Sequence, residues 1–393
     1  MESKQFYAFY RKISVADAKK YRGKHEASYL FKRRKTRIIG DAVLKKIIIF
    51  IFIYAFSSII NAENIVDVYG VNPNISESVI KNYGSQVGEI EAKFTNEIIK
   101  LSNGSKDEKA LNSILLRKNE LIEKIKQKYS FSFVDFNTVL YPNDKNTYTT
   151  IEVITQNDKS RLRFVHKKTP NTLNQKPKHD LITKMIEFQQ IQGQLMLNNQ
   201  FGTKGIECPV YHCLPNFDHP ELKDLFSLFN SSVVKEKELI LSTINHDSDP
   251  ERRTAAVYLM GYLNEPNEII SFLTDHILDI DEGVRNAAMR VIGETMLKAK
   301  IAQINVLPYL SLLESPYETD RNKALLVLCQ AVSSKQSREL IIRQGKSRLL
   351  SLLRLKQPNN KNAVYELLKK ISGKDFSSAN YRAWEQWFSK SKA

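Results

Sequence analysis

The sequence lacks the short motifs by which many enzymes hold a phosphate group, a zinc ion or a reactive serine. It contains no Gly-rich phosphate-binding loop, no His-Glu-x-x-His helix and no Gly-x-Ser-x-Gly turn. Cysteine is scarce as well, with three residues in 393, which excludes a fold held together mainly by disulfides. These absences indicate no cofactor, and they favour binding of another molecule over catalysis.

The sequence also lacks an apolar run of the roughly 20 residues that a transmembrane helix needs. The run Ile47–Ile60 is shorter, follows Lys45 and Lys46, and ends at Asn61 and Ala62. A basic start, a short apolar core and a small final residue are typical of a secretory signal peptide. We therefore predict export to the periplasm or out of the cell. The alternative is a membrane anchor through residues 47–62, which would then be the protein's contact with the membrane.

Basic residues are in excess, with 59 Lys and Arg against 43 Asp and Glu, a net charge of +16. The excess is concentrated in residues 1–62, which hold 14 basic and 4 acidic residues, whereas the rest of the chain holds 45 and 39. An exported chain without residues 1–62 would therefore be only mildly basic. Since nucleic-acid binding depends on clustered positive charge, we expect no nucleic acid among its partners.

One pattern recurs four times between residues 232 and 372. The copies align on Arg253, Arg285, Arg321 and Lys361, with apolar residues three, four, six and seven positions after each. These offsets put the apolar residues on one face of a helix. Other amphipathic stretches lie between the copies: Val234–Ile244, Ile269–Leu278, Ile301–Leu313 and Arg338–Leu353. The repeat therefore predicts a row of two-helix units, which bury their apolar faces by stacking.

The repeat resembles the HEAT-repeat family of α-solenoids. The resemblance is carried by Asp249 with Arg253 and by Asp281 with Arg285. It implies a ladder of hydrogen bonds between these turn acids and helix arginines, continued by Arg321. The last two units depart from the pattern, because Tyr317 and Gln357 stand where the acid is expected. The repeats also lack the His-Glu pairs that HEAT-like metal enzymes carry on their helices.

Residues 63–157 predict a small α+β domain in front of the repeats. The order is strand, helix, helix, strand, strand, over Ile65–Val71, Ser76–Leu101, Asp107–Tyr129, Phe131–Tyr141 and Tyr148–Thr155. This order is similar to that of the POTRA domain. The similarity implies binding of extended segments by addition of a strand to an open sheet edge. The alternative is an α+β domain that shields the first repeat.

Residues 158–231 predict a connecting region that contains the most reactive cluster of the chain. Gln156–Lys178 is polar and is interpreted as a linker, and Asp180–Leu197 as an amphipathic helix. The cluster that follows supports three interpretations: a disulfide between Cys208 and Cys213, a metal site, or side chains that only pack. The candidate metal ligands are Cys208, His212, Cys213 and His219.

Residues 373–393 predict a terminal helix with an aromatic face. Tyr381, Trp384 and Phe388 are spaced by three and four residues, so they share one side of a helix. We interpret this helix as a cap on the last repeat, with an anchor for a partner as the alternative. Candidate partner contacts are Arg252, Arg290 and Lys323 on the second helices of the repeats, together with Trp384 and Trp387.

The sequence thus predicts a mainly α protein, in which a HEAT-like solenoid follows a small α+β domain. A stacked row of helix pairs offers a long curved surface. We therefore predict an exported scaffold that binds another protein or a peptide. The alternative is a metal-dependent or Cys/His-dependent enzyme that uses the Cys208–His219 loop.

Overall fold

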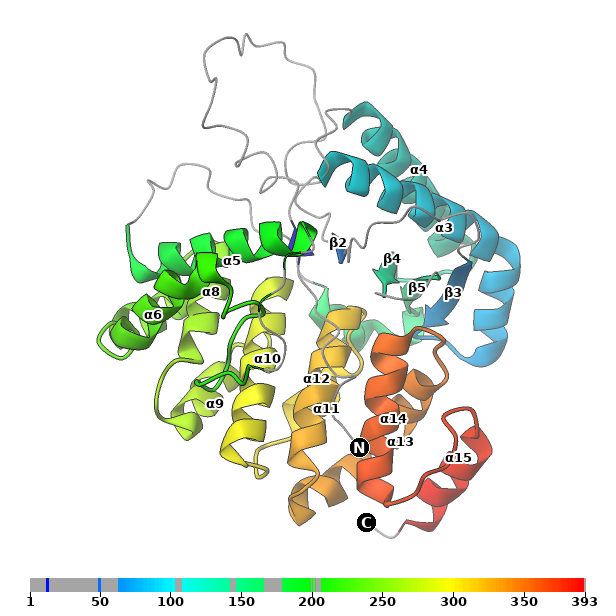
Figure 1. Cartoon of the computed structure of the whole chain (residues 1–393). Helices are drawn as coiled ribbons and strands as arrows, with labels where there is room; N and C mark the ends of the chain where they lie inside the picture. The colour runs from blue at the N-terminus through cyan, green and yellow to red at the C-terminus, as the bar shows by residue number, and fades with distance from the viewer. Residues whose placement is uncertain are drawn as a thin grey trace.

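The computed structural model describes residues 12–13, 49–50, 63–102, 108–141, 146–165, 179–198, 200, 202 and 206–391. The protein is mainly helical, with a small sheet near the N-terminus followed by many helices (Figure 1). The predicted signal segment lies outside the described residues except for two positions, so export and anchoring stay predictions. Within the described part of the chain, no helix has the length and apolar character required to cross a bilayer.

The sheet is built from three strands, β3 (Asn64–Tyr69), β4 (Phe133–Leu140) and β5 (Thr147–Ile154). β5 lies in the middle, antiparallel to β4 and parallel to β3, so that Ile151 is in register with both Phe136 and Val68. The two-residue strands β2 (Ile49–Phe50) and β1 (Lys12–Ile13) extend the sheet beyond β4. β3 therefore ends the sheet on the other side.

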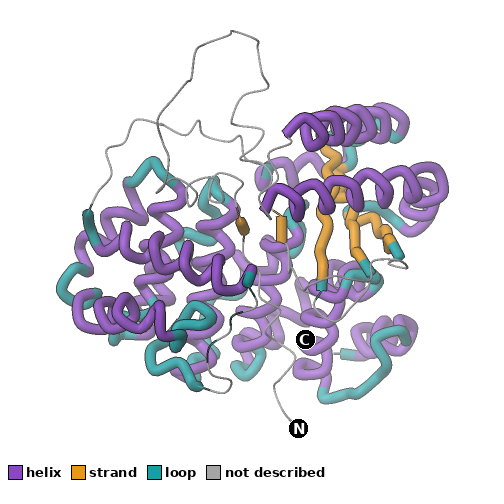
Figure 2. The backbone as a smooth tube through the Cα atoms, turned by 45° about the horizontal axis from the view of Figure 1, so that its top comes forward, coloured by secondary structure: helices purple, strands orange, loops and turns teal. Residues whose placement is uncertain are grey.

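Two long helices, α3 (Pro73–Ser102) and α4 (Glu108–Lys128), cover one face of the sheet, as Figures 1 and 2 show. Val79 and Val87 of α3 and Ile125 of α4 are fully buried against Ile151 and its neighbours. Gly70 makes the sharp turn from β3 into α3 with a positive φ of 102°, a conformation that a side chain would strain. The strand and helix order matches the order predicted from the sequence.

The remaining helices follow along the chain. Before the repeats come η1 (Gln156–Phe164), α5 (Leu181–Leu197), η2 (Pro220–Leu222) and α6 (Lys223–Ser232). The repeat region contains α7 (Lys237–His246), α8 (Pro250–Met260), α9 (Pro266–Thr274), α10 (Glu282–Ala299), α11 (Leu307–Leu312), α12 (Glu318–Ala331), α13 (Lys335–Leu353) and α14 (Pro358–Ser372). The last helix is α15 (Tyr381–Lys390).

The repeat helices pack in sequence order. α8, α10, α12 and α14 each contact the next one, and α7, α9, α11 and α13 pack against the helix that follows them (Figure 1). Ala256, Ala288 and Ala324 are fully buried in this row, because a small side chain lets neighbouring helices approach closely. Gly293 serves the same purpose, since a Cβ there would lie 2.9 Å from the side chain of Leu326.

Three local predictions were wrong. The helix α6 was not predicted, and the helix predicted over Ile301–Leu313 forms only at Leu307–Leu312, as α11. The supposed linker Gln156–Lys178 begins with η1, whose Arg161 and Phe164 are buried. Polar composition pointed to a loop, but these two side chains attach the segment to the rest of the protein.

Candidate functional site

The repeat arginines form a regular pattern at the turns between paired helices. In each unit the guanidinium donates to the backbone oxygen of the residue six positions earlier. The three bonds are Arg253 to Asp247 (2.9 Å), Arg285 to Asp279 (2.9 Å) and Arg321 to Ser315 (2.8 Å). Each arginine thereby ties the start of its helix to the turn that precedes it.

The same arginines also reach the next unit, but not through the acids that the sequence suggested. Arg253 pairs with Asp279 at 2.8 Å, and Arg285 pairs with Asp320 at 2.9 Å. Asp249 accepts from the backbone N–H of Glu251, and Asp281 accepts from the N–H groups of Gly283 and Val284. The predicted roles of these two acids were wrong. They stand at the N-cap position, where a carboxylate satisfies the free N–H groups of the first turn.

Arg321 finds its acid outside the row of helix pairs. Its guanidinium donates to both carboxylate oxygens of Glu152 on β5, at 2.5 and 2.9 Å, and neither side chain is more than 1% exposed. The guanidinium also lies 4.1 Å from the ring centre of Tyr69. The turn before α14, Leu355-Lys356-Gln357, has no acid that could fill this place. Glu152 of the sheet therefore supplies the acid that pairs with Arg321.

Three further contacts hold the sheet on the turns before α12 and α14. Tyr69 donates from its hydroxyl to the Leu313 oxygen at 2.6 Å. Arg161 bridges the Glu314 oxygen and the Val153 oxygen at 2.8 and 3.1 Å. The Asp67 carboxylate accepts from the N–H groups of Lys356 and Gln357 at 2.5 and 3.1 Å. The sheet domain therefore packs on the third and fourth helix pairs, and the idea that it shields the first one was wrong.

A groove runs along β3 on the outer edge of the sheet. We call it the β3 groove. It has a volume of about 830 Å³ and is lined by β3, by α3 and by Lys356 of the repeat row. Gly84, Gly88 and Ala92 lie one turn apart on the α3 side. At Gly88 the helix approaches so closely that an added Cβ would lie 3.0 Å from the Cβ of Asn64. At Gly84, by contrast, an added Cβ would meet only Ile80 of α3 itself, so this position is open.

Among the described residues, no strand pairs with the outer edge of β3, so backbone N–H and C=O groups line this side of the groove. The N–H of Thr147 donates to the Glu63 oxygen at 3.0 Å, so residue 63 directs its backbone toward β5. Successive residues of a strand alternate in direction, and the backbone groups of Asn64 and Val66 therefore point away from β5 into the groove. Unpaired N–H and C=O groups at a sheet edge are a template for another strand.

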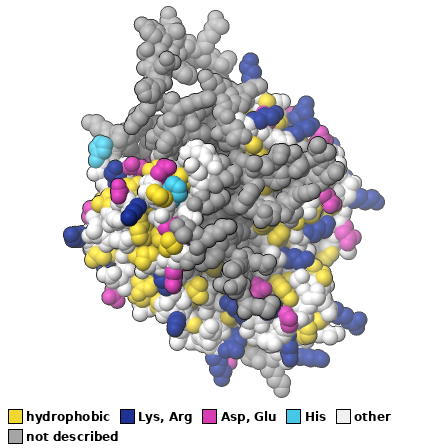
Figure 3. All heavy atoms as spheres, in the orientation of Figure 1, with side chains coloured by type: hydrophobic (Ala, Val, Ile, Leu, Met, Phe, Trp, Pro, Cys, Tyr) yellow, Lys and Arg dark blue, Asp and Glu magenta, His cyan; other side chains and the backbone are white. Residues whose placement is uncertain are grey.

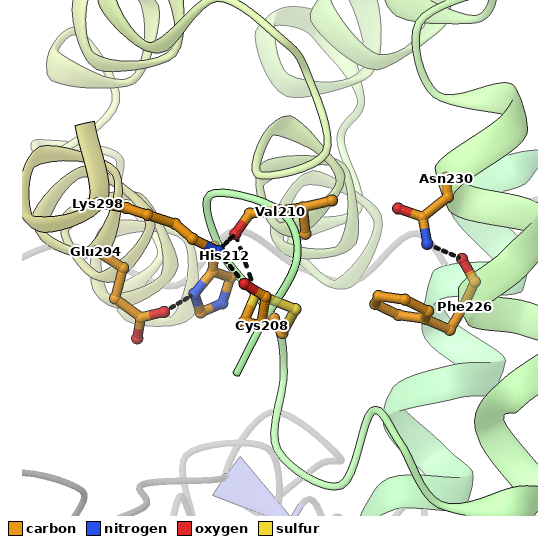
Figure 4. Close-up of a disulfide and its surroundings, with 8 residues drawn as sticks. Cys208, Val210, His212, Phe226, Asn230, Glu294 and Lys298 are labelled. Carbon is orange, nitrogen blue, oxygen red and sulfur yellow. Dashed lines mark hydrogen bonds and ion pairs between the residues drawn. A yellow bond between two sulfur atoms is a disulfide. The ribbon is translucent and has the colours of Figure 1, made fainter. Parts of the chain in front are cut away.

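The predicted disulfide between Cys208 and Cys213 is confirmed, and it closes a small loop on α8 and α10 (Figure 4). The N–H groups of Tyr211 and His212 donate to the Gly261 oxygen at 3.0 and 3.3 Å. The Lys298 ammonium donates to the backbone oxygens of Cys208 and Val210. The loop is thus attached at several points.

His212 and His219 have structural partners. His212 is buried, stacks on Tyr258, and its Nδ1 lies 2.5 Å from a Glu294 oxygen. Burial alone would raise the pKa of Glu294, but His212 and the nearby Arg290 and Lys323 charges outweigh it and lower that pKa. His219 accepts from the Glu221 N–H at the start of η2. The metal interpretation would need both thiols, which form the disulfide, and no cluster of three potential ligands occurs among the described residues.

The predicted partner contacts are mostly inaccessible. Arg252, Arg290 and Lys323 are each at most 7% exposed, and Arg252 is paired with Asp180 at 2.6 Å. Trp384 is fully buried and Trp387 is half-buried. The assignment of these residues, apart from Trp387, to a partner surface was therefore wrong. α15 instead packs its aromatic face on α13.

Comparison of the chain with protein-family models, with curated proteins and with solved structures finds no match.

Four residues of the groove and of the junction between the sheet and the helix row were not predicted from the sequence: Asp67, Glu152, Arg161 and Lys356. A signal for two of them was present. Asp67 and Glu152 are single acids inside otherwise apolar strand segments, Ile65–Tyr69 and Ile151–Ile154. A buried acid is stable only when it is paired or hydrogen-bonded, so an acid in such a strand indicates a partner on another element.

Proposed function

We propose that the protein is an exported scaffold that binds an extended segment of another protein along the β3 groove. The observation that carries the proposal is the free edge of β3 beside a groove of about 830 Å³. A segment that pairs with this edge gains main-chain hydrogen bonds, and the groove beside the strand accepts alternate side chains. This mode of binding needs no reactive side chain.

The repeat row serves as the support in this proposal. Its helix pairs and its arginine contacts between successive units favour a HEAT-like solenoid, in which each unit is stabilised by its neighbours. The sheet is fixed to that row by the buried Arg321–Glu152 pair. A groove on a firmly held sheet loses little conformational freedom when it binds, which favours affinity.

Two observations support the proposed location and the class of partner. A disulfide is compatible with an oxidising compartment outside the cytosol. On the face drawn in Figure 3, the described Lys and Arg side chains are scattered together with acidic ones and do not gather in one patch. That distribution favours a protein partner over nucleic acid.

A matched pair of variants on α3 tests the proposal. Ser85 lines the groove and is exposed, whereas its neighbour Gln86 is exposed but does not line it. We expect Ser85→Trp to block the groove and Gln86→Trp to leave it open, with equal thermal unfolding. Immobilised full-length wild type and both variants are exposed to an envelope extract, and bound proteins are quantified.

The expected result is a protein that wild type and Gln86→Trp retain and that Ser85→Trp loses by at least about tenfold, or about 1.4 kcal/mol of binding free energy. Equal recovery on all three chains would place binding elsewhere and contradict the proposal. Recovery of no protein whose binding depends on position 85 would also contradict the proposal.

A further inference from the structure

The two ends of the β3 groove carry opposite charges. Glu63 lies at the end where β3 begins, and Lys356 lies at the end where the turn before α14 meets the strand. Both side chains are exposed. The lining of the groove therefore offers a carboxylate near one end and an ammonium near the other to a ligand.

Lys356 is held in this place by the strand itself. The Asp67 carboxylate on β3 accepts from the N–H groups of Lys356 and Gln357. Burial raises the pKa of Asp67, while these two hydrogen bonds and the Lys356 charge act to lower it. One end of the groove thus comes from the repeat row, and a sheet domain alone would lack it.

Neither end charge is neutralised by an ion pair with another described residue. Glu89 and Lys93, the other charged residues of the lining, are paired with each other at 2.5 Å. Among the described residues, the only acid bonded to the Lys356 segment is the buried Asp67, which accepts from its backbone N–H groups. The charges of Glu63 and Lys356 therefore remain available to a ligand.

The strand sets the spacing between Glu63 and Asp67, whose carboxylate holds the backbone of Lys356. Glu63 and Asp67 are four residues apart, which is about 13 Å at the rise of a β-strand. A ligand paired with β3 has nearly the same rise. Complementary charges on it would therefore be separated by about four residues.

We propose that the groove selects an extended segment with a basic residue at the Glu63 end and an acidic residue, or a free carboxyl terminus, at the Lys356 end, about four residues apart. This inference rests on the proposed function and adds the charge pattern of the segment. Main-chain pairing provides binding without regard to sequence, whereas the two end charges provide selectivity and fix the direction of the segment.

The test is a selection of random peptides on the full-length chain. A displayed library of eight-residue peptides is depleted on Ser85→Trp and then selected on wild type. The same library is selected on the double variant Glu63→Lys with Lys356→Glu, in which the end charges are exchanged. Both substitutions are on exposed side chains, and thermal unfolding and Gln86→Trp serve as controls.

The expected result is an enrichment of peptides with one basic and one acidic residue about four positions apart, and the reverse order on the double variant. A peptide selected on wild type should bind each single variant, Glu63→Lys or Lys356→Glu, about fivefold more weakly at low salt. The loss should be smaller at high salt. The same peptide with neutral replacements should bind wild type and the double variant equally.

Three other outcomes bear on this inference and on the function on which it rests. Peptides that depend on position 85 but show no charge pattern would overturn the selectivity and leave the groove as a binding site. A selection that yields no such peptide would overturn both. Self-association through β3, lost in Ser85→Trp and seen without any peptide, would identify a second copy as the occupant and contradict the inference.

Discussion

The helix row and the sheet junction use the same residue type in different ways. In the row, Arg253 and Arg285 each pair with an acid of the next helix pair; the first pair is about 10% exposed and the second at most 2%. At the junction, Arg321 occupies the equivalent position but pairs with Glu152 of the sheet, and both are almost fully buried. The arginine of a repeat can therefore attach a different domain when the next repeat lacks the expected acid.

The largest effect is expected from Arg321→Met, which leaves Glu152 buried without its partner. Removal of one partner of a buried ion pair costs about 3–5 kcal/mol, so the free energy of unfolding in urea should fall by that amount. The double variant Arg321→Met with Glu152→Leu removes both charges and should recover most of the loss. A single variant as stable as the double one would show that the pair does not hold the junction.

The next effect concerns pH, through Glu318 at the start of α12. It is 1% exposed, and burial raises its pKa from 4.5 to about 7, while Arg321 and Lys323 oppose the rise. Because the pKa is higher in the folded state, Glu318 contributes stability that is complete below pH 4.5 and is lost as pH rises through 7.

Stability measured from pH 4 to 8 should therefore fall less in Glu318→Gln than in wild type, by up to about 3 kcal/mol. Asp67 is also buried at the junction with a raised pKa, and it should behave identically in the two proteins. Parallel curves for the two proteins would contradict the assignment.

A smaller effect is expected at the other end of the row, where the disulfide loop packs on α8 and α10. Replacing Cys208 and Cys213 together by Ser opens a loop with a sequence separation of 5. A loop this short contributes about 2 kcal/mol through the unfolded chain. Urea unfolding of wild type with and without reductant provides the same comparison, and an unchanged midpoint would contradict the estimate.

The smallest effect is expected from Arg253→Met in the row, at about 1–2 kcal/mol, because its more exposed pair with Asp279 is worth less than a buried one. Asp279 also keeps the Asp281 N–H as a donor at 2.7 Å. Urea unfolding measured beside Arg321→Met checks the ranking. Equal losses in the two variants would contradict this ranking of the two pairs.

Local patterns could be predicted from the sequence, and contacts between distant segments could not. The helix pairs follow from repeated apolar spacing, and the sheet domain follows from strand alternation and turns. The Arg321–Glu152 pair joins positions 169 residues apart, and no local pattern encodes that distance. Asp249 and Asp281 were assigned to the ladder because of their spacing, but Arg253 reaches Asp279, two residues before Asp281, and Arg285 reaches Asp320.

The groove could not be predicted from the sequence for a similar reason, because it forms between β3, α3 and Lys356. Binding was expected on the second helices of the repeats, with Arg252 and Arg290 among the candidate contacts. The structure buries them. The strand edge was expected only as part of a similarity in element order, and its wall depends on Gly84, Gly88 and Ala92, which carry no signal for binding on their own.

The two hydrogen bonds between Asp67 and the turn before α14 join the sheet to the helix row. A rotation of the sheet on the helix row changes the separation between Glu63 and Lys356, since these residues belong to different parts of the molecule. A segment of fixed length that engages both ends would favour one angle between the parts. Because binding and this angle are thermodynamically coupled, any contact that restricts the sheet to the favoured angle would increase the affinity for the segment.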